Sequence, residues 1–200
     1  SLMAIVSGSK GADMRIYFNK AFRHWGREGK LKTHLLNSLQ THIGTEHNDG
    51  AWTLLSEMVP FVKSVNAKFV LEYWTEHLCN EDTEHLNTLN KVLTVMGFTA
   101  KHLPKDQLEP LSKQLQARLM KFDSPPELIS VTLVTLQKLS NAEGARKKLD
   151  KYFIELLKKC DEFLSDVILN DRASSDDNVV VDEDMVARYL FTLGEVAQLC

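Results

Sequence analysis

The sequence has no apolar run long enough to cross a membrane. Glu, Lys or His interrupts each such run well short of the ~18 residues that a spanning helix needs. The opening residues, SLMAIVSGSKG, also lack the basic start and the apolar core of a secretory signal peptide. We therefore expect no membrane partner.

Cysteine is scarce, and so are the motifs of nucleotide chemistry. Cys79, Cys160 and Cys200 are odd in number and far apart, which favours reduced thiols in a nuclear or cytosolic protein over a disulfide framework. The short GSKG at 8–11 has neither the spacing nor the preceding strand of a phosphate-binding loop. These absences argue against a secreted disulfide scaffold and against a nucleotide-binding enzyme.

Groups capable of chemistry are present but are not clustered. No Ser lies in a nucleophile-elbow context, and the paired carboxylates fall in polar loops, where no pocket shifts a pKa. His77, Cys79 and His85 are the best metal candidates, yet they are too few for a closed zinc site. His42 and His47 lie in a turn and are expected to be solvated. We therefore predict a protein that is not an enzyme and has no cofactor, no metal and no small-molecule substrate.

What the sequence does have is helical periodicity of apolar residues. In 86–104, LNTLNKVLTVMGFTAKHLP, apolar residues recur three and four positions apart, and Val92, Val95 and Phe98 add a second apolar flank. This helix should be covered on more than one side. Gly97, in mid-helix, is expected to let a neighbouring helix come close.

This pattern recurs along the chain. A shift of 97 positions places four residues on their counterparts in 86–104: Leu190 on Leu93, Leu193 on Met96, Gly194 on Gly97 and Ala197 on Ala100. A shift of 40 positions gives a degenerate copy with Leu133 and Leu136. Apolar helices that recur at roughly 40 to 50 residues, each too apolar to stand alone, are typical of an α-solenoid of stacked helix pairs.

The remaining segments also read as helices, and no convincing strand is found. Asn66 is expected to cap a helix, Pro60 to bend one, and Ser124 with Pro125 to start another. A long helix over about 144–169 should bury an apolar face made of Leu149, Phe153, Leu156, Leu157, Cys160, Leu164, Val167 and Ile168. The predicted fold is all-α, an α-solenoid of HEAT repeats in which antiparallel helix pairs stack.

We expect residues 1–200 to form one continuous solenoid fragment, with 170–183 as an acidic, flexible loop between two helices. Position 1 is not Met, and the last predicted helix reaches Cys200 without a terminating Gly, Asn or Pro. The chain is therefore expected to be a slice of a longer protein.

Charge is unevenly distributed and suggests a DNA contact. Residues 1–40 carry seven basic and two acidic groups, a net charge of +5, and 170–184 carry six acids and one Arg, a net charge of −5. The basic region could bind nucleic-acid phosphates without sequence preference, or it could be a solvated helix end. The candidate DNA-binding residues are Lys20, Arg23, Arg27, Lys30 and Lys32.

Two further binding hypotheses concern the acidic loop and the aromatic residues. Ser174 and Ser175 precede Asp176 and Asp177, a setting that acid-preferring kinases accept, although an unmodified loop is the simpler interpretation. A set of aromatic residues could line a groove for a partner peptide, but such residues at helical spacing are more often core. The set is Tyr73, Trp74, Phe98 and Phe153.

Several stretches resemble the large HEAT-repeat, D-type non-SMC subunits of condensin II. They are FNKAFRHWGREGKLKTHLLNSLQTHIGTEHNDGAWTLLSEM at 18–58, AKHLPK at 100–105, PPELIS at 125–130 and, above all, DEDMVARYLFTLGEVAQLC at 182–200. The similarity is weakest around 142–159 and in the acidic loop.

The resemblance implies a non-catalytic subunit of a complex that condenses mitotic chromosomes in the nucleus. It implies a kleisin subunit, SMC ATPase subunits and DNA as partners, with ATP hydrolysis elsewhere in the complex. The alternative interpretation is a HEAT-repeat scaffold of another system, either a nuclear transport receptor or a phosphatase scaffold.

Overall fold

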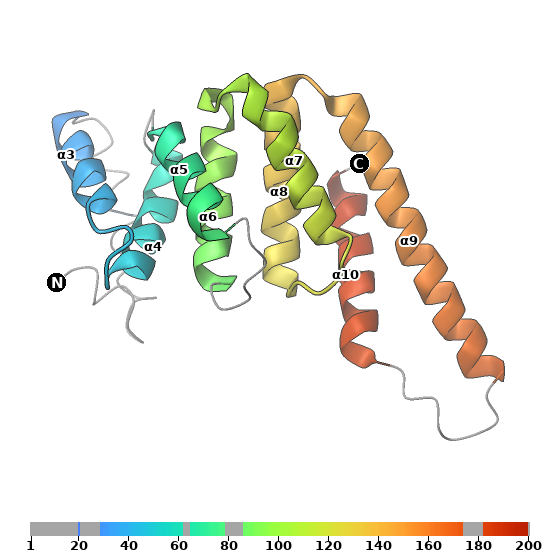
Figure 1. Ribbon diagram of the computed structural model, residues 1–200. Helices are drawn as coiled ribbons and strands as arrows, with labels where there is room; N and C mark the ends of the chain where they lie inside the picture. Colours follow the sequence, from blue (N-terminus) through green and yellow to red (C-terminus); the bar gives the residue numbers. More distant parts are fainter. Residues whose placement is uncertain (1–19, 21–28, 62–64, 79–85, 174–181, 200) are drawn as a thin grey trace. The chain divides into compact units, whose positions relative to one another are not determined.

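The computed structural model is all-α, which confirms the predicted fold class (Figure 1). It describes residues 20, 29–61, 65–78, 86–173 and 182–199, and these contain helices and turns but no β-strand. None of the described helices is long and apolar enough to span a bilayer. The chain divides into two compact units, Ser1–Pro104 and Lys105–Cys200.

Within the first unit, the described helices contact helices that are adjacent in the sequence or separated by one helix. Helix α4 contacts both α3 and α6, and α5 contacts α6. The described elements are α3 (Gly29–Gln40), α4 (Asn48–Met58), the 3₁₀ turn η1 (Val59–Phe61), α5 (Ala67–Tyr73), the π-helical turn η2 (Trp74–Leu78), α6 (Leu86–Thr99) and the 3₁₀ turn η4 (Ala100–His102).

The core of this unit surrounds α4, which is buried on several sides. Ala51, Leu54 and Met58 pack with Leu39 of α3. The Trp52 ring stacks on Phe69 of α5 and lies at a tilt of 55° to the Tyr73 ring. The predicted apolar face of 86–104 is confirmed, because Leu89, Leu93, Met96, Ala100 and Leu103 are buried, and so are Val92 and Val95 on the second flank. The prediction that Phe98 is covered on this flank is wrong, because Phe98 is 45% exposed.

Local signals in the sequence account for the turns of the first unit. The Asn66 side chain accepts a hydrogen bond from the Lys68 backbone N–H at 3.2 Å and caps α5, as predicted. Gly44 has φ +78°, a conformation that glycine adopts without steric cost, in the turn between α3 and α4. Pro60 is exposed in η1, where α4 gives way to a 3₁₀ turn.

Residues 105–173 and 182–199 of the second unit form four helices, and each contacts the next in the chain. Helix α10 also contacts α8 (Figure 1). The helices are α7 (Lys105–Leu119), α8 (Pro126–Glu143), α9 (Arg146–Ala173) and α10 (Glu183–Leu199). Side-by-side packing of successive helices in each unit agrees with a solenoid, while the HEAT class and the single continuous fragment over 1–200 stay predictions.

The buried faces of α7 to α9 follow their apolar spacing. Leu108, Leu111, Leu115 and Leu119 of α7 are buried, as are Leu149, Phe153, Leu156 and Cys160 of α9. Ile168 was wrongly included in the buried face of α9, because it is 52% exposed. Helix α8 ends at Gly144 (φ +77°), where the Ala145 backbone N–H donates to the Ser140 carbonyl at 2.9 Å.

A stack of three aromatic rings joins the α7–α8 turn, α9 and α10. The Tyr189 ring lies between Phe122 and Phe163, with centroid distances of 3.8 and 4.0 Å and interplanar angles of 8° and 14°. Phe122 has φ 54°, which is rare for a bulky residue, and its side chain is buried. At the start of α10, the Asp182 carboxylate accepts a hydrogen bond from the Met185 backbone N–H at 3.1 Å.

Candidate functional site

The described part of the chain includes three of the five predicted DNA-binding residues. Lys20 is helical and exposed, and Lys30 and Lys32 lie in α3. Arg23 and Arg27 lie outside the described residues. The DNA contact therefore stays a prediction.

The other predicted sites are only partly described. Ser174 and Ser175 lie outside the described residues, as do Cys79 and His85 of the metal candidate. Within the described ranges, no group of three or more His, Cys, Asp or Glu residues could hold a metal ion. His42 and His47 lie in the turn before α4 with ring centroids 6.0 Å apart.

The aromatic residues considered for a peptide groove are mostly core. Tyr73, Trp74 and Phe153 are buried, and the Tyr73 hydroxyl accepts a hydrogen bond from Asn48 Nδ2 at 2.8 Å. Only Phe98 is exposed. The favoured interpretation of these residues as core is therefore confirmed for three of the four.

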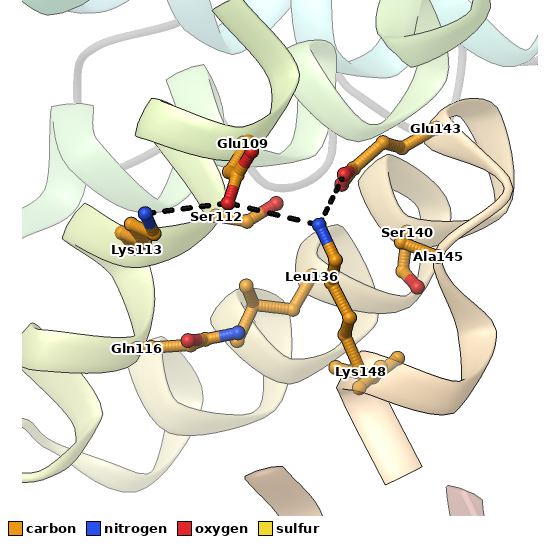
Figure 2. Close-up of a pocket in the computed structure, with 10 residues that line it drawn as sticks. Glu109, Ser112, Lys113, Gln116, Leu136, Ser140, Glu143, Ala145 and Lys148 are labelled. Carbon is orange, nitrogen blue, oxygen red and sulfur yellow. Dashed lines mark hydrogen bonds and ion pairs between the residues drawn. The ribbon is translucent and has the colours of Figure 1, made fainter. Parts of the chain in front are cut away.

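A small pocket lies within the second unit, between α7, the end of α8 and the start of α9 (Figure 2). It exists because Gly144 reverses the chain and brings the first turn of α9 opposite α7. Its volume is about 100 Å³. The lining residues are Glu109, Ser112, Lys113 and Gln116 of α7, Leu136, Ser140 and Glu143 of α8, and Ala145, Lys148 and Leu149.

Two lysines and two glutamates alternate around this pocket and neutralise one another. Glu109 lies 3.2 Å from the Lys113 amine and 3.6 Å from that of Lys148, which in turn lies 3.3 Å from Glu143 (Figure 2). The hydrogen bond from Lys113, followed by the positive charges of Lys113 and Lys148, lowers the pKa of Glu109. The hydrogen bond to Glu143 and the nearby carboxylates raise the pKa of Lys148. Both shifts favour the charged forms, so neither group is poised to transfer a proton near neutral pH.

Two hydroxyl groups in this pocket have no hydrogen-bond partner among the described residues. They are Ser112 Oγ and Ser140 Oγ, and Ser140 is only 5% exposed. Buried hydroxyls normally form hydrogen bonds, but both of these oxygens are themselves buried and are not open to a group bound in the pocket. It has no His or Cys in its lining to activate either serine. The ionisable groups that line this pocket are held in their charged forms by one another.

Sequence reasoning missed this pocket. Its ion pairs join residues on three helices, and one of them, Lys148 with Glu109, bridges α7 and α9. No local spacing reveals such a contact. The sequence offers one signal, a glycine at position 144 that can end a helix and reverse the chain. It does not indicate which residues the reversal brings together.

Comparison with known proteins shows which proteins the chain is similar to. No protein-family model matches it, and no solved structure matches it. It is 34% identical over its whole length to "Condensin-2 complex subunit D3" of Mus musculus, and 32% identical over 96% of its length to "Condensin-2 complex subunit D3-L" of Xenopus laevis. The chain spans 13% of the length of each relative. The resemblance found in the sequence is thus confirmed, and the chain is a homologue of a segment of the condensin II D3-type subunits.

Proposed function

We propose that this chain is part of a non-catalytic scaffold subunit of condensin II. In this role it supports the condensation of mitotic chromosomes in the nucleus, by helping to hold the kleisin and SMC ATPase subunits and by contacting DNA. The observation that carries the proposal is similarity to D3-type subunits over 100% of the chain in one relative and 96% in the other.

The packing of the helices supports a binding role. Helices α7 and α9 each bury one face against their neighbours and leave another at the surface, as in solenoid scaffolds that bind long partners. The pocket between α7, α8 and α9 is small and charge-balanced, and its ionisable residues favour their ordinary charged forms. These properties favour a scaffold over an enzyme.

The test is a pull-down of the full-length subunit with and without the segment corresponding to residues 1–200. We expect removal of the segment to reduce recovery of the kleisin or SMC subunits. A matched control removes a helical segment of equal length elsewhere in the subunit, followed by circular dichroism to verify folding. Unchanged recovery of all condensin II subunits would contradict a partner-holding role for this segment.

The DNA contact is tested separately in the intact assembly. Lys30→Glu with Lys32→Glu should weaken duplex binding and reduce its dependence on salt, because each phosphate contact adds to the release of counterions. The matched control is Lys101→Glu with Lys105→Glu, which changes the net charge equally at two exposed lysines outside α3. Equal affinity and an equal salt slope in the Lys30/Lys32 variant and the unmodified assembly would rule this contact out.

The acidic loop is the third part of the proposal. Phosphorylation of Ser174 and Ser175 would deepen its negative charge. Phosphopeptide mapping in dividing cells should find phosphate on at least one of the two serines. Recovery of both only in unmodified form would remove this element of the proposal.

A further inference from the structure

The outward face of α9 carries a row of exposed side chains opposite its packed face. Helix α9 packs against α8 and α10, and its buried residues include Leu149, Phe153 and Leu156. Four exposed residues follow the spacing i, i+4, i+7 and i+11 on the other side of the helix, so they form one row. We call this row the α9 stripe: Lys147, Lys151, Ile154 and Lys158.

The charge of α9 runs against the helix dipole. Residues 146–159 contain six basic and two acidic residues, whereas 160–173 contain four acidic and one basic residue. The first turn of α9 contains no acidic residue. A helix is stabilised by acids near its N-terminus and bases near its C-terminus, so this arrangement does not serve the stability of α9.

The lysines of the α9 stripe form no ion pair with other described residues. Neighbouring basic groups do so: Arg146 lies 3.0 Å from Asp150, and Lys148 pairs with Glu143 and Glu109. The stripe therefore presents three lysines without a close ion pair on one face of a regular helix, with the exposed Asp150 and Glu155 beside them. Over 11 residues, a helix rises about 16 Å, which is the length of contact available.

The exposed apolar side chain of Ile154 indicates which kind of polyanion could bind this face. It interrupts the row of lysines and is 54% exposed, so a partner that covers it gains from burial of apolar surface. A DNA backbone offers no apolar group at that position. Beyond Lys158, the exposed Asp161 and Glu162 would repel any polyanion that continued along the helix, so a duplex is disfavoured and the acidic face of a partner helix must end there.

We propose that the α9 stripe docks an acidic amphipathic helix of a partner protein. Carboxylates on one face of the partner helix pair with the three stripe lysines, and an apolar side chain between them packs on Ile154. The spacing of four, three and four residues is the same in either direction, so the row fits helices of both orientations. This interaction goes beyond the proposed scaffold function and does not depend on it.

The experiment uses the full 200-residue chain and a synthetic probe. The probe is a fluorescein-labelled, helix-forming peptide of 18 residues with glutamates and a central leucine on one face. Binding is measured by fluorescence anisotropy. We expect Lys151→Glu with Lys158→Glu to weaken binding at least tenfold, and a peptide with lysines in place of the glutamates to bind this variant and restore affinity.

Matched variants separate a specific site from general charge. Lys101→Glu with Lys105→Glu changes the net charge equally and should alter the dissociation constant less than twofold. Ile154→Ser should weaken binding of the leucine peptide about fivefold and leave binding of a serine version of the peptide unchanged, since it removes the apolar surface that the leucine covers. Circular dichroism verifies that each variant is folded.

Three outcomes would overturn the proposal. Equal loss of binding in the two charge-reversal pairs would show a non-specific charge effect. Tighter binding of a 20-base-pair duplex than of the peptide, with no effect of Ile154→Ser, would assign the face to DNA. Self-association of the chain in sedimentation experiments, abolished by Lys151→Glu with Lys158→Glu, would assign it to a second copy.

Discussion

Helices α6 and α10 share one sequence pattern but differ in how much of it they bury. Leu93 and Met96 of α6 are fully buried, whereas Leu190, the counterpart of Leu93, is 53% exposed, and Leu193 is only partly buried. Helix α6 contacts α4 and α5, and α10 contacts α8 and α9. Helix α6 also contacts the η1 turn, so the two helices do not have equivalent surroundings.

The difference is explained by which row of side chains each helix presents to its neighbours. In α10, the row Tyr189, Thr192 and Val196 faces the packed side, with the last two buried. Their counterparts in α6, displaced by 97 positions, are Val92, Val95 and Thr99, and all three are buried. Both helices thus bury this row, and α6 also buries the row of Leu93. The recurring pattern marks an apolar face, and only the neighbouring helices determine whether it is covered.

The largest expected effect comes from truncating the paired leucines. Leu93→Ala should lower the free energy of unfolding by about 2–5 kcal/mol, because it leaves a cavity in a packed core. Leu190→Ala should cost less than about 1 kcal/mol, since its side chain is already half in water. Urea denaturation followed by circular dichroism measures both. Equal losses would mean that the outer face of α10 is covered in solution.

The reactivity of the Cys160 thiol measures how often the packed face of α9 becomes exposed to solvent. Burial raises the pKa of its thiol to about 11, so alkylation at pH 8 should be roughly a hundredfold slower than in the denatured chain. Because the folded-state pKa lies above the unfolded value, the folded state favours the protonated thiol. Stability from this group is present below the unfolded pKa and is lost as the pH rises through the folded one. Labelling of a Cys79→Ser, Cys200→Ser chain, with and without urea, checks this. Equal rates would show that this face opens readily.

The aromatic stack is expected to hold α10 in place. Tyr189→Ala removes the middle ring of three and should destabilise the chain by about 2 kcal/mol, whereas Tyr189→Phe retains the stacking and should cost little. Thermal unfolding of the two variants measures the difference. Equal destabilisation by both substitutions would show that the hydroxyl, and not the ring, matters.

The smallest expected effect concerns the glycines of the shared pattern. A methyl group added at Gly194 meets no other atom within 4 Å, so Gly194→Ala should stabilise the chain by about 0.5–1 kcal/mol through helix propensity. Gly97 is buried, and its predicted role in close helix approach stays a prediction. A destabilised Gly194→Ala variant in urea denaturation would indicate a neighbour against this part of α10.

Most of the fold could be predicted because its signals are local. Asn66 caps α5, Ser124 and Pro125 precede α8, and the four leucines of α7 line one buried face. The errors at Phe98 and Ile168 share one cause. Helical spacing identifies an apolar residue on the flank of a helix, but whether that flank is covered depends on helices distant in sequence.

Little of the candidate pocket could be predicted. Ser112 and Ser140 lie 28 positions apart on different helices, and no sequence pattern shows that both residues line one pocket. The Glu109 and Lys148 pair likewise depends on how α9 is placed after Gly144. In contrast, the α9 stripe follows from spacing within a single helix, and only the exposure of its members required the structure.

The left-handed backbone of Phe122 has a consequence for local opening. A bulky residue adopts this conformation at an energetic cost of order 1–3 kcal/mol, and here the ring of Phe122 is held against Tyr189 of α10. Departure of α10 would therefore free the α7–α8 turn to relax. The amides of this turn and of α10 should share one protection factor in hydrogen exchange, as members of a single cooperative unit.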